Sequence, residues 1–345
     1  MAFAEGWEDI ETYGLAKKAW LKKFLPLNNG IPKHDVYRRV FNCLRPEAIE
    51  QCFMAWVRDI KQDTAQEIIA VDGKTVRGSF NSQLGTSPLH LVSAWAARNR
   101  LVLAQVKTHD KSNEITAIPS LLELIALEGC IVTIDAMGCQ YKIADYIVEE
   151  KADYVFSLKE NQQSLYQDAA EYFQGIDFSH PAPDVLVEST FDVDHGRLER
   201  RSYGVSGNVT WLTERHPAWK TVKSIGIVQS TRETPEKTST ECRYFVSSLN
   251  PDPKLFAAAV RAHWGIENSL HYVLDVAFRE DACRIKTGAA PENWAWFRKI
   301  AMTVARSDKQ SADSVKKRVK QMAWSDEYLE HLLFHSSFAS EPVPS

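Results

Sequence analysis

Two short apolar runs in this sequence each end in an aspartate, and these aspartates are the first candidates for chemistry. Residues 68–71 precede Asp72 in "IIAVDGKT", and residues 131–134 precede Asp135 in "IVTIDAMG". Short β-branched runs bounded by glycine predict buried strands. A carboxylate at the end of a buried strand is costly to ionise without a cation or hydrogen-bond donors. For Asp72, a turn-forming role before Gly73 is the alternative.

Neighbouring strands would bring the two carboxylates together. If the strands that carry Asp72 and Asp135 are adjacent, the two side chains lie about one strand spacing, roughly 5 Å, apart. Two anions at that distance repel each other unless a divalent cation lies between them. The pattern therefore predicts Mg²⁺ or Mn²⁺ held by oxygen ligands.

A third carboxylate is expected from the helical stretch that begins at Lys254. Glu267 is the first candidate, because the residues three and four positions away are mostly apolar and would carry it inward. A surface position is the alternative for Glu267. Three other carboxylates on the same stretch stay open as candidates, namely Asp275, Glu280 and Asp281.

The sequence around these acids alternates strands and helices. Three strands in antiparallel succession, followed by two helical crossovers, predict a mixed sheet with helices packed on both faces. The five predicted strands are 68–80, 89–99, 100–110, 130–138 and 153–159. The chain divides into an N-terminal helical domain (1–63), a first core part (64–159), a β-rich insertion (160–248), a helical core part with Glu267 (249–305) and a basic helical tail (306–345).

Composition excludes several classes of protein. With 345 residues, 44% of them hydrophobic and 25% charged, the chain is an ordinary globular protein. Its longest apolar stretch, residues 89–97, is too short to span a bilayer, and its start lacks the features of a signal peptide, which predicts a cytoplasmic protein. Six cysteines without CxxC pairing disfavour zinc ribbons and a disulfide framework.

Charge is distributed unevenly along the chain. The formal net charge of -4 gives no overall attraction to nucleic acid. From Trp296 to Lys320, however, eight basic residues face two acidic ones, and from Glu160 to Arg243 thirteen acidic residues face nine basic ones. Segregated charge of this kind predicts a local basic surface.

Six segments of the sequence resemble the ISAs1-type insertion-sequence transposases, which include the H-repeat-associated proteins. They are "AVDGKTVRG", "KSNEITAIPSLLELI", "TIDAMGCQ", "DYVFSLKENQ", "HGRLERR" and "RAHWGIENSLHYVLDVAFREDACRI". The resemblance runs from about residue 5 to residue 305. It implies the DDE group's RNase H-like α/β core, interrupted by the β-rich insertion and preceded by a transposase-associated helical domain. It further implies that Asp72, Asp135 and Glu267 form the DDE triad.

The resemblance implies metal-dependent DNA strand cleavage and strand transfer at insertion-sequence ends, with two Mg²⁺ or Mn²⁺ ions in the DNA-bound state. The expected partners are double-stranded DNA, as transposon ends and target, and a possible homodimer on DNA. Neither a membrane partner nor a nucleotide cofactor is expected. The expected location is the bacterial cytoplasm, in association with the nucleoid. A repurposed metal-dependent nuclease and a non-mobile DNA-binding protein of the same fold are the alternatives. Family members usually have more residues ahead of "AEGWEDIETYG", so this chain is expected to start late.

Basic and polar residues around the triad are expected to bind DNA. Lys74 and Arg77 follow Asp72 and are assigned to scissile or flanking phosphates, with a solvated turn as the alternative. The other expected DNA contacts are Lys159, Asn161, His195, Arg197, Arg200, Arg261, His263, Arg279, Lys316, Lys317, Arg318 and Lys320. Trp264 is expected in the core rather than stacked on a base. A zinc helix of His263, Glu267 and His271 is disfavoured, because no HExxH pattern or nearby cysteine accompanies it.

Overall fold

The computed structural model describes residues 4–60, 67–80, 87–108, 114–194, 197–234 and 237–334. Contacts within the chain divide it into two units. Unit 1 comprises residues 1–63, 73–113 and 267–345, and unit 2 comprises residues 64–72 and 114–266. The chain therefore passes from one unit to the other directly after Asp72 and directly after Ile266.

The strands form one hydrogen-bonded series in the order β3-β2-β1-β4-β5-β9-β8-β7-β6. Within it, β1, β4 and β5 run parallel, and β2 and β3 form an antiparallel hairpin. The first five strands are β1 (Ile68–Val76), β2 (Leu89–Ala96), β3 (Leu101–Lys107), β4 (Ile131–Ile134) and β5 (Asp153–Leu158). All five were predicted from their apolar runs. An antiparallel hairpin beside parallel strands is the RNase H-like arrangement that the sequence predicts.

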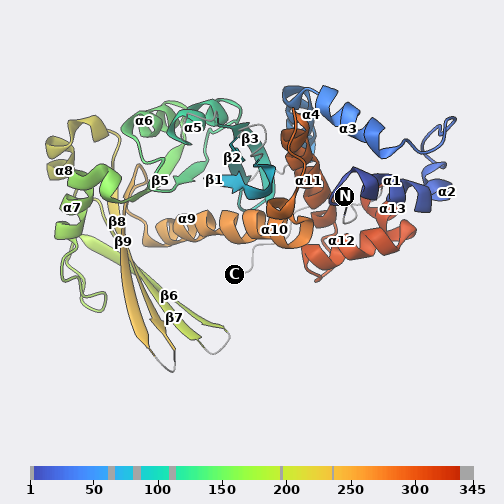
Figure 1. Ribbon diagram of the computed structural model, residues 1–345. Helices are drawn as coiled ribbons and strands as arrows, with labels where there is room; N and C mark the ends of the chain where they lie inside the picture. Colours follow the sequence, from blue (N-terminus) through green and yellow to red (C-terminus); the bar gives the residue numbers. More distant parts are fainter. Residues whose placement is uncertain are drawn as a thin grey trace. The chain divides into compact units, whose positions relative to one another are not determined.

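Helices cover both faces of the parallel strands in unit 2. Figure 1 shows α5 (Glu114–Glu123) and α6 (Tyr141–Glu149) on one side of β5 and α9 (Pro253–Ile266) on the other. Strands buried on both faces read as continuous apolar runs rather than alternating ones. All four residues of β4 are accordingly buried. The prediction of helices on both faces is confirmed.

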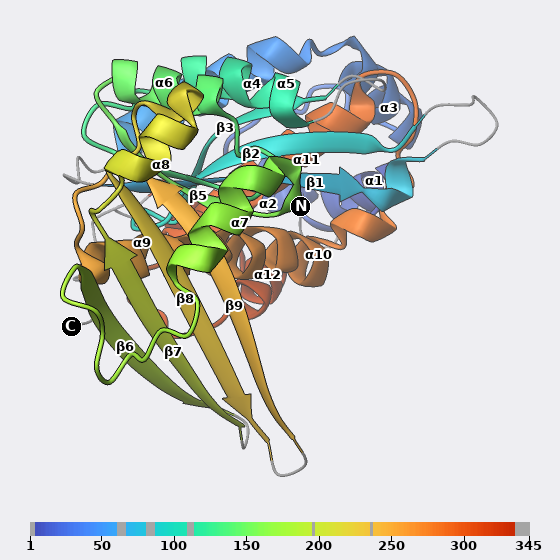
Figure 2. The ribbon, with the colours of Figure 1, turned by 90° about the vertical axis from the view of Figure 1, so that its left-hand side faces the viewer.

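The segment from 160 to 248 continues the same sheet. Its strands are β6 (Val185–Asp194), β7 (Arg197–Ser206), β8 (Ser224–Glu233) and β9 (Thr238–Ser247). Neighbouring strands among these four are antiparallel, and β9 joins the series through β5. Figure 2 shows all four as long strands that extend beyond β5. Two helices in this segment, α7 (Gln163–Tyr172) and α8 (Thr210–Arg215), were not predicted.

Helices dominate unit 1. The N-terminal ones are α1 (Trp7–Ala16), α2 (Lys18–Leu21), α3 (His34–Cys43) and α4 (Pro46–Ile60), and the C-terminal ones are α10 (Tyr272–Phe278), α11 (Ala290–Arg306), α12 (Val315–Trp324) and α13 (Asp326–Phe334). The central helix is α11, whose Trp294 and Trp296 are each 1% exposed. Trp294 packs against Trp7 and Phe41. The N-terminal helices α1 and α3 thus share a core with α11.

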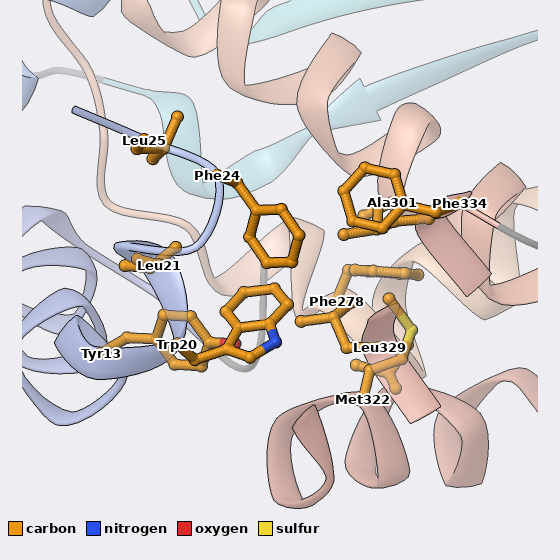
Figure 3. A pocket seen from close by; sticks show the side chains of 12 residues that line it. Tyr13, Trp20, Leu21, Phe24, Leu25, Phe278, Ala301, Met322, Leu329 and Phe334 are labelled. Carbon is orange, nitrogen blue, oxygen red and sulfur yellow. The ribbon is translucent and has the colours of Figure 1, made fainter. Parts of the chain in front are cut away.

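An apolar pocket of about 300 Å³ lies between the N-terminal and C-terminal helices of unit 1. Figure 3 shows the aromatic rings that line it, including Trp20 from α2, Phe24 from the turn after α2 and Phe334 from α13. Phe24 and Phe334 stack with their ring centroids 5.0 Å apart. Lys17 strengthens the same contact through an ion pair of 2.7 Å with Asp326.

Short helical turns connect the larger elements. They are η1 (Arg77–Ser79), η2 (Glu160–Gln162), η3 (Pro217–Trp219), the π-helical turn η4 (Glu267–His271) and η5 (Glu280–Ala282). The turn η4 follows α9 and leads directly into α10. Among the described helices, none combines the length and the apolar character needed to cross a bilayer.

Candidate active site

Asp72 and Asp135 lie side by side in unit 2. Asp135 directly follows β4, as predicted, whereas β1 continues to Val76, so Asp72 lies inside its strand, after four fully buried residues, and not at the strand's end. In the parallel pair of β1 and β4, Val71 is the register partner of Ile134. Asp72 and Asp135 each follow one of these partners, so the two aspartates occupy the next level of the same pair. The predicted adjacency of the two strands is confirmed.

Asp135 sits in a turn that partly satisfies its carboxylate. Its Oδ1 accepts hydrogen bonds from the backbone N–H of Met137 at 3.0 Å and of Gly138 at 3.3 Å. Burial raises the pKa of Asp135, and the negative charge of Asp72 raises this pKa further. Loss of hydration and a like-charged neighbour both favour a bound cation here.

Polar side chains of unit 2 hold this turn from two sides. Asn161 donates from Nδ2 to the carbonyl of Ala136 at 2.5 Å, directly after Asp135. The neighbouring Gln162 donates from Nε2 to the carbonyl of Cys139 at 3.0 Å. The predicted contact residue Asn161 therefore braces the loop that carries the second aspartate, while the adjacent Lys159 is exposed.

His263 of α9 faces the aspartate pair. Its Nδ1 lies 3.2 Å from Thr133 Oγ1, on the strand that leads to Asp135. Burial lowers the pKa of His263, and the charges of Asp72 and Asp135 oppose that change. The His263 ring therefore packs beside the strand that leads to Asp135 and feels the charges of both acids.

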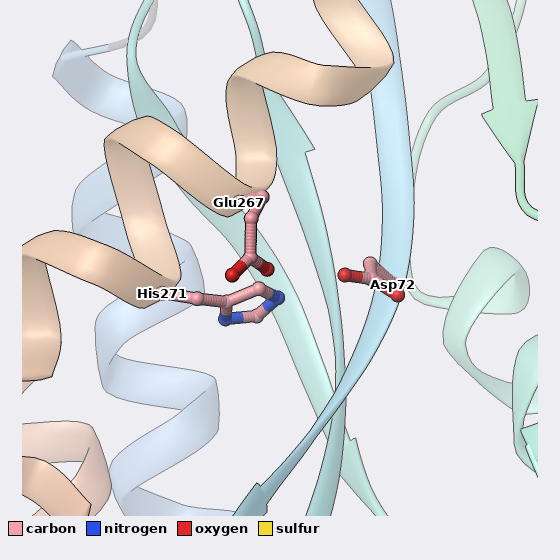
Figure 4. Close-up of side chains that lie close together, drawn as sticks. All are labelled: Asp72, Glu267 and His271. Atoms are coloured by element: carbon pink, nitrogen blue, oxygen red, sulfur yellow. The ribbon is translucent and has the colours of Figure 1, made fainter. Parts of the chain in front are cut away.

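Glu267 and His271 come from one turn, η4. Both residues belong to unit 1, and each offers one ligand atom within 4.8 Å of the other. Figure 4 shows the Glu267 carboxylate and the His271 ring next to each other on this turn. Sequence reasoning set His271 aside, although its spacing of four from Glu267 was the available signal.

The competing carboxylates of the same stretch are engaged with a lysine. Lys74 Nζ lies 2.6 Å from Asp275 Oδ1, 3.0 Å from Glu280 Oε2 and 4.0 Å from Asp281 Oδ1. Glu280 is 1% exposed, and nearby cations outweigh its burial and lower its pKa. Among the four candidates for the third carboxylate, Glu267 is therefore the one that does not pair with Lys74 among the described residues.

The basic side chains of the remaining predicted DNA contacts differ in their exposure and in the groups that they contact. Arg77 has an 84% exposed side chain, 3.7 Å from Asp281. Arg261 pairs with Asp192 at 2.8 Å, whereas the guanidinium of Arg200 lies over the Phe191 ring at 5.4 Å.

Trp264 differs from its expected core position, since it is 47% exposed. The physical reason is a cation–π contact: the Arg243 guanidinium lies 4.5 Å from the centre of the Trp264 ring. Two predicted contacts, His195 and the side chain of Arg197, lie outside the described residues.

Part of the basic segment from Trp296 to Lys320 is structural. Arg298 and Lys299 are each 2% exposed. Arg318 donates to the carbonyls of Ala305 and Ser311. The remaining predicted contacts lie nearer the surface. Lys316 and Lys317 are exposed and Lys320 is half-buried. Lys317 pairs with Asp313 at 2.6 Å, and Arg279 pairs with Glu5.

Comparison with known proteins decides the family. Residues 63–304 match the family model described as the transposase DDE domain, and residues 1–57 match the DDE_Tnp_1-associated model. This chain belongs to the DDE transposase family. It is therefore a transposase, a DNA-acting enzyme that depends on divalent metal, and the recognition made from its sequence is confirmed.

Curated relatives of this transposase agree with that assignment. The protein YncI of Escherichia coli O157:H7, named as a transposase, is 42% identical over 96% of this chain and 86% of its own length. YhhI of E. coli K12, named as an H repeat-associated transposase, is 36% identical over 97% and 89%. Among solved structures, a piggyBac transposase synaptic complex with hairpin DNA aligns with 98% of this chain at 11% identity and a TM-score of 0.42, a likeness too distant to carry an argument.

Proposed function

We propose that Asp72, Asp135 and Glu267 are the catalytic triad of this transposase and hold its divalent metal ions. The observation that carries the proposal is the register of β1 and β4, which sets two aspartates at the same level of a parallel strand pair. Glu267 is proposed as the third carboxylate, because the three competing acids of the same stretch pair with Lys74. The nuclease and binding-only alternatives are not favoured by the family.

The donor set fits Mg²⁺ or Mn²⁺. Carboxylate oxygens are the ligands that both ions prefer. Burial, together with the charge of Asp72, raises the pKa of Asp135, and a bound cation would offset both effects. His271 adds a nitrogen donor to the group. Nitrogen ligands bind Mn²⁺ better than Mg²⁺, so we propose that Mn²⁺ supports activity at lower concentration than Mg²⁺.

The chemistry supplied by such ions is activation of a water or 3′-hydroxyl and stabilisation of the leaving oxygen during in-line phosphoryl transfer. The residues of the chain provide the framework. Hydrogen bonds from Met137 and Gly138 orient the Asp135 carboxylate, and Asn161 holds the loop behind it. Arg77 and Lys159, both exposed, are proposed to bind phosphates on either side of the cleaved bond.

We propose double-stranded DNA at insertion-sequence ends and at the target as the substrate, bound by two copies of this chain. The site of action is then the bacterial nucleoid. Lys316, Lys317 and Lys320 provide positive charge at the C-terminal end of unit 1 for binding DNA that lies away from the cleaved bond.

One assay separates the transposase from a nuclease and from a binding protein. The full chain is incubated with labelled duplexes that carry the ends of its own element, with Mg²⁺, Mn²⁺ or Ca²⁺, and both nicked and joined products are resolved. Cleavage followed by joining with Mg²⁺ or Mn²⁺ is the expected result. Cleavage without joining would indicate a nuclease, and binding without cleavage would contradict the proposal.

A further inference from the structure

The turn η4, which carries Glu267, is π-helical within an otherwise α-helical stretch. A π-turn bonds residue i to residue i+5, so its carbonyl groups are displaced from the regular α-helical pattern. Two of these carbonyls accept hydrogen bonds from basic side chains of unit 1. Arg306 of α11 donates to the carbonyl of Ser269, and Lys74 Nζ of β1 donates to the carbonyl of His271 at 3.4 Å.

Lys74 is deeply engaged within unit 1. Its side chain is 11% exposed, and its ammonium group contacts Asp275 of α10 at 2.6 Å and Glu280 of η5 at 3.0 Å. Because Asp275 lies on the helix that follows η4 directly, Lys74 holds that turn and the helix after it. Removing one partner of a buried ion pair leaves the other charge buried without compensation. The two partners are therefore expected to stay in contact, and this contact fixes the geometry of the elements that carry them.

Arg306 holds the same turn from α11. Besides Ser269, its guanidinium donates to the carbonyl of Arg100 at 3.2 Å and lies 4.8 Å from the centre of the Trp95 ring. These contacts link η4 to β2 and to the turn before β3, all within unit 1. A planar guanidinium that is stacked and bonded on several edges has little freedom to move.

We propose that Lys74 and Arg306 are positioning residues that clamp the π-turn and thereby fix the direction of the Glu267 carboxylate. This proposal rests on the proposed function, because it takes Glu267 as a triad member. It replaces the expected role of Lys74 as a phosphate contact: an ammonium group shared by Asp275, Glu280 and a backbone carbonyl is committed to the protein.

The first test is hydrogen exchange on the intact chain, without DNA and without metal, so its result does not depend on catalysis. In Lys74→Met and in Arg306→Met, amides of residues 269–275 should exchange at least about tenfold faster, because the turn opens more often. The matched control is Lys151→Met, which removes an exposed lysine paired with Glu128 at 3.1 Å in unit 2. Unchanged exchange in both variants would overturn the clamp.

The second test separates positioning from phosphate binding. A phosphate contact contributes roughly 0.9 to the log–log salt slope of DNA binding, so its loss would flatten that slope. For a positioning residue, Lys74→Met leaves the slope unchanged and lowers the cleavage rate at saturating DNA, and Lys74→Arg recovers part of that rate. A flattened slope with unchanged exchange would instead assign Lys74 to DNA.

A milder variant covers the case in which Lys74→Met does not fold. Asp275→Asn removes the closest Lys74 contact from a 35% exposed side chain and leaves the Glu280 contact in place. The clamp predicts faster exchange in residues 269–275 and unchanged DNA affinity. If Lys74 bound phosphate, the loss of the competing carboxylate would strengthen DNA binding and leave exchange unaltered, which would refute the clamp.

Discussion

Val71 of β1 and Ile134 of β4 are register partners in a parallel strand pair, and each is followed directly by an aspartate. This relationship places two acids at the same level of adjacent strands, where backbone geometry rather than side-chain flexibility sets their separation. Burial and the neighbouring charge of Asp72 raise the pKa of Asp135. Because two such carboxylates are more stable with a cation than without one, the strand pair itself favours metal binding.

Divalent metal should stabilise the folded protein. An ion that binds the native state and not the unfolded chain adds about 2.7 kcal/mol at a hundredfold excess over its dissociation constant. This gain is measured as the thermal unfolding midpoint of the wild type and of Asp135→Asn while Mg²⁺, Mn²⁺ or Ca²⁺ is titrated into each protein. The midpoint should rise in the wild type and much less in the variant. An equal rise in both proteins would show that the ions bind elsewhere.

Gly78→Ala should destabilise unit 1. A Cβ at this position of η1 would lie 2.2 Å from the Cys283 carbonyl oxygen and 2.6 Å from that of Asp281. Both atoms belong to the backbone, so the two turns must move apart, at a cost of about 1–3 kcal/mol. Gly265→Ala is the control, because a Cβ there meets nothing within 4 Å. The chemical denaturation midpoints of the two variants are compared. Equal midpoints would contradict the close approach of Gly78 to the backbone of η5.

Glu50 of α4 should make stability depend on pH. Burial, with the charges of Glu292 and Glu47, raises the pKa of Glu50 from 4.5 to about 7. The folded protein therefore holds this proton more tightly than the unfolded chain, and stability falls as pH rises between these two values. Glu50→Gln should be more stable than wild type by about 1–2 kcal/mol at pH 8. Below pH 4.5 this difference should vanish.

The control for Glu50 is an exposed glutamate of the other unit, Glu123 on α5. Glu123→Gln should leave the pH dependence of the unfolding midpoint unchanged. If Glu50→Gln also leaves the pH dependence unchanged, the half-buried position of Glu50 beside Glu292 and Glu47 does not affect its titration, and the prediction is wrong.

The exposed and half-buried lysines of the basic tail should contribute to DNA affinity. Replacing Lys316, Lys317 and Lys320 by Gln should reduce the log–log salt slope of DNA binding by up to about 2.7, since each phosphate contact contributes roughly 0.9. Arg318 is left intact because its guanidinium bonds to backbone carbonyls. Replacing Lys142, Lys151 and Lys220, which are exposed in unit 2, is the control. An unchanged slope in the tail variant would identify this segment as a solvated helix face.

Much of the core could be predicted from the sequence, because its strands are recognisable locally. Buried parallel strands need continuous buried runs, and residues 68–71 of β1 and 131–134 of β4 are such runs. The positions of Asp72 and Asp135 followed from those runs. The helices α7 and α8 were missed because each is short and lies among strand-forming segments.

Other features depend on partners far away in the sequence. The sequence predicts Lys74 as a phosphate ligand because the carboxylates that surround it lie some two hundred positions later, 201 in the case of Asp275. The charge pattern of the sequence includes Lys299 in the predicted basic surface, although its side chain is buried and donates a hydrogen bond to Gln105 of β3. The exposure of Trp264 depends likewise on Arg243 from another strand. Local patterns carry no information on such pairings.

The most direct measurement is the rate of a single DNA cleavage event in Asp72→Asn, Asp135→Asn and Glu267→Gln, each at saturating DNA and Mn²⁺. Charge stabilisation by bound metal is worth several kcal/mol, so each variant should be slower by about a thousandfold or more while keeping its DNA affinity and unfolding midpoint. Glu128→Gln, an exposed glutamate, is the matched control and should cleave at the wild-type rate. A wild-type rate in any one of the three variants would remove that residue from the triad and contradict the proposed metal site.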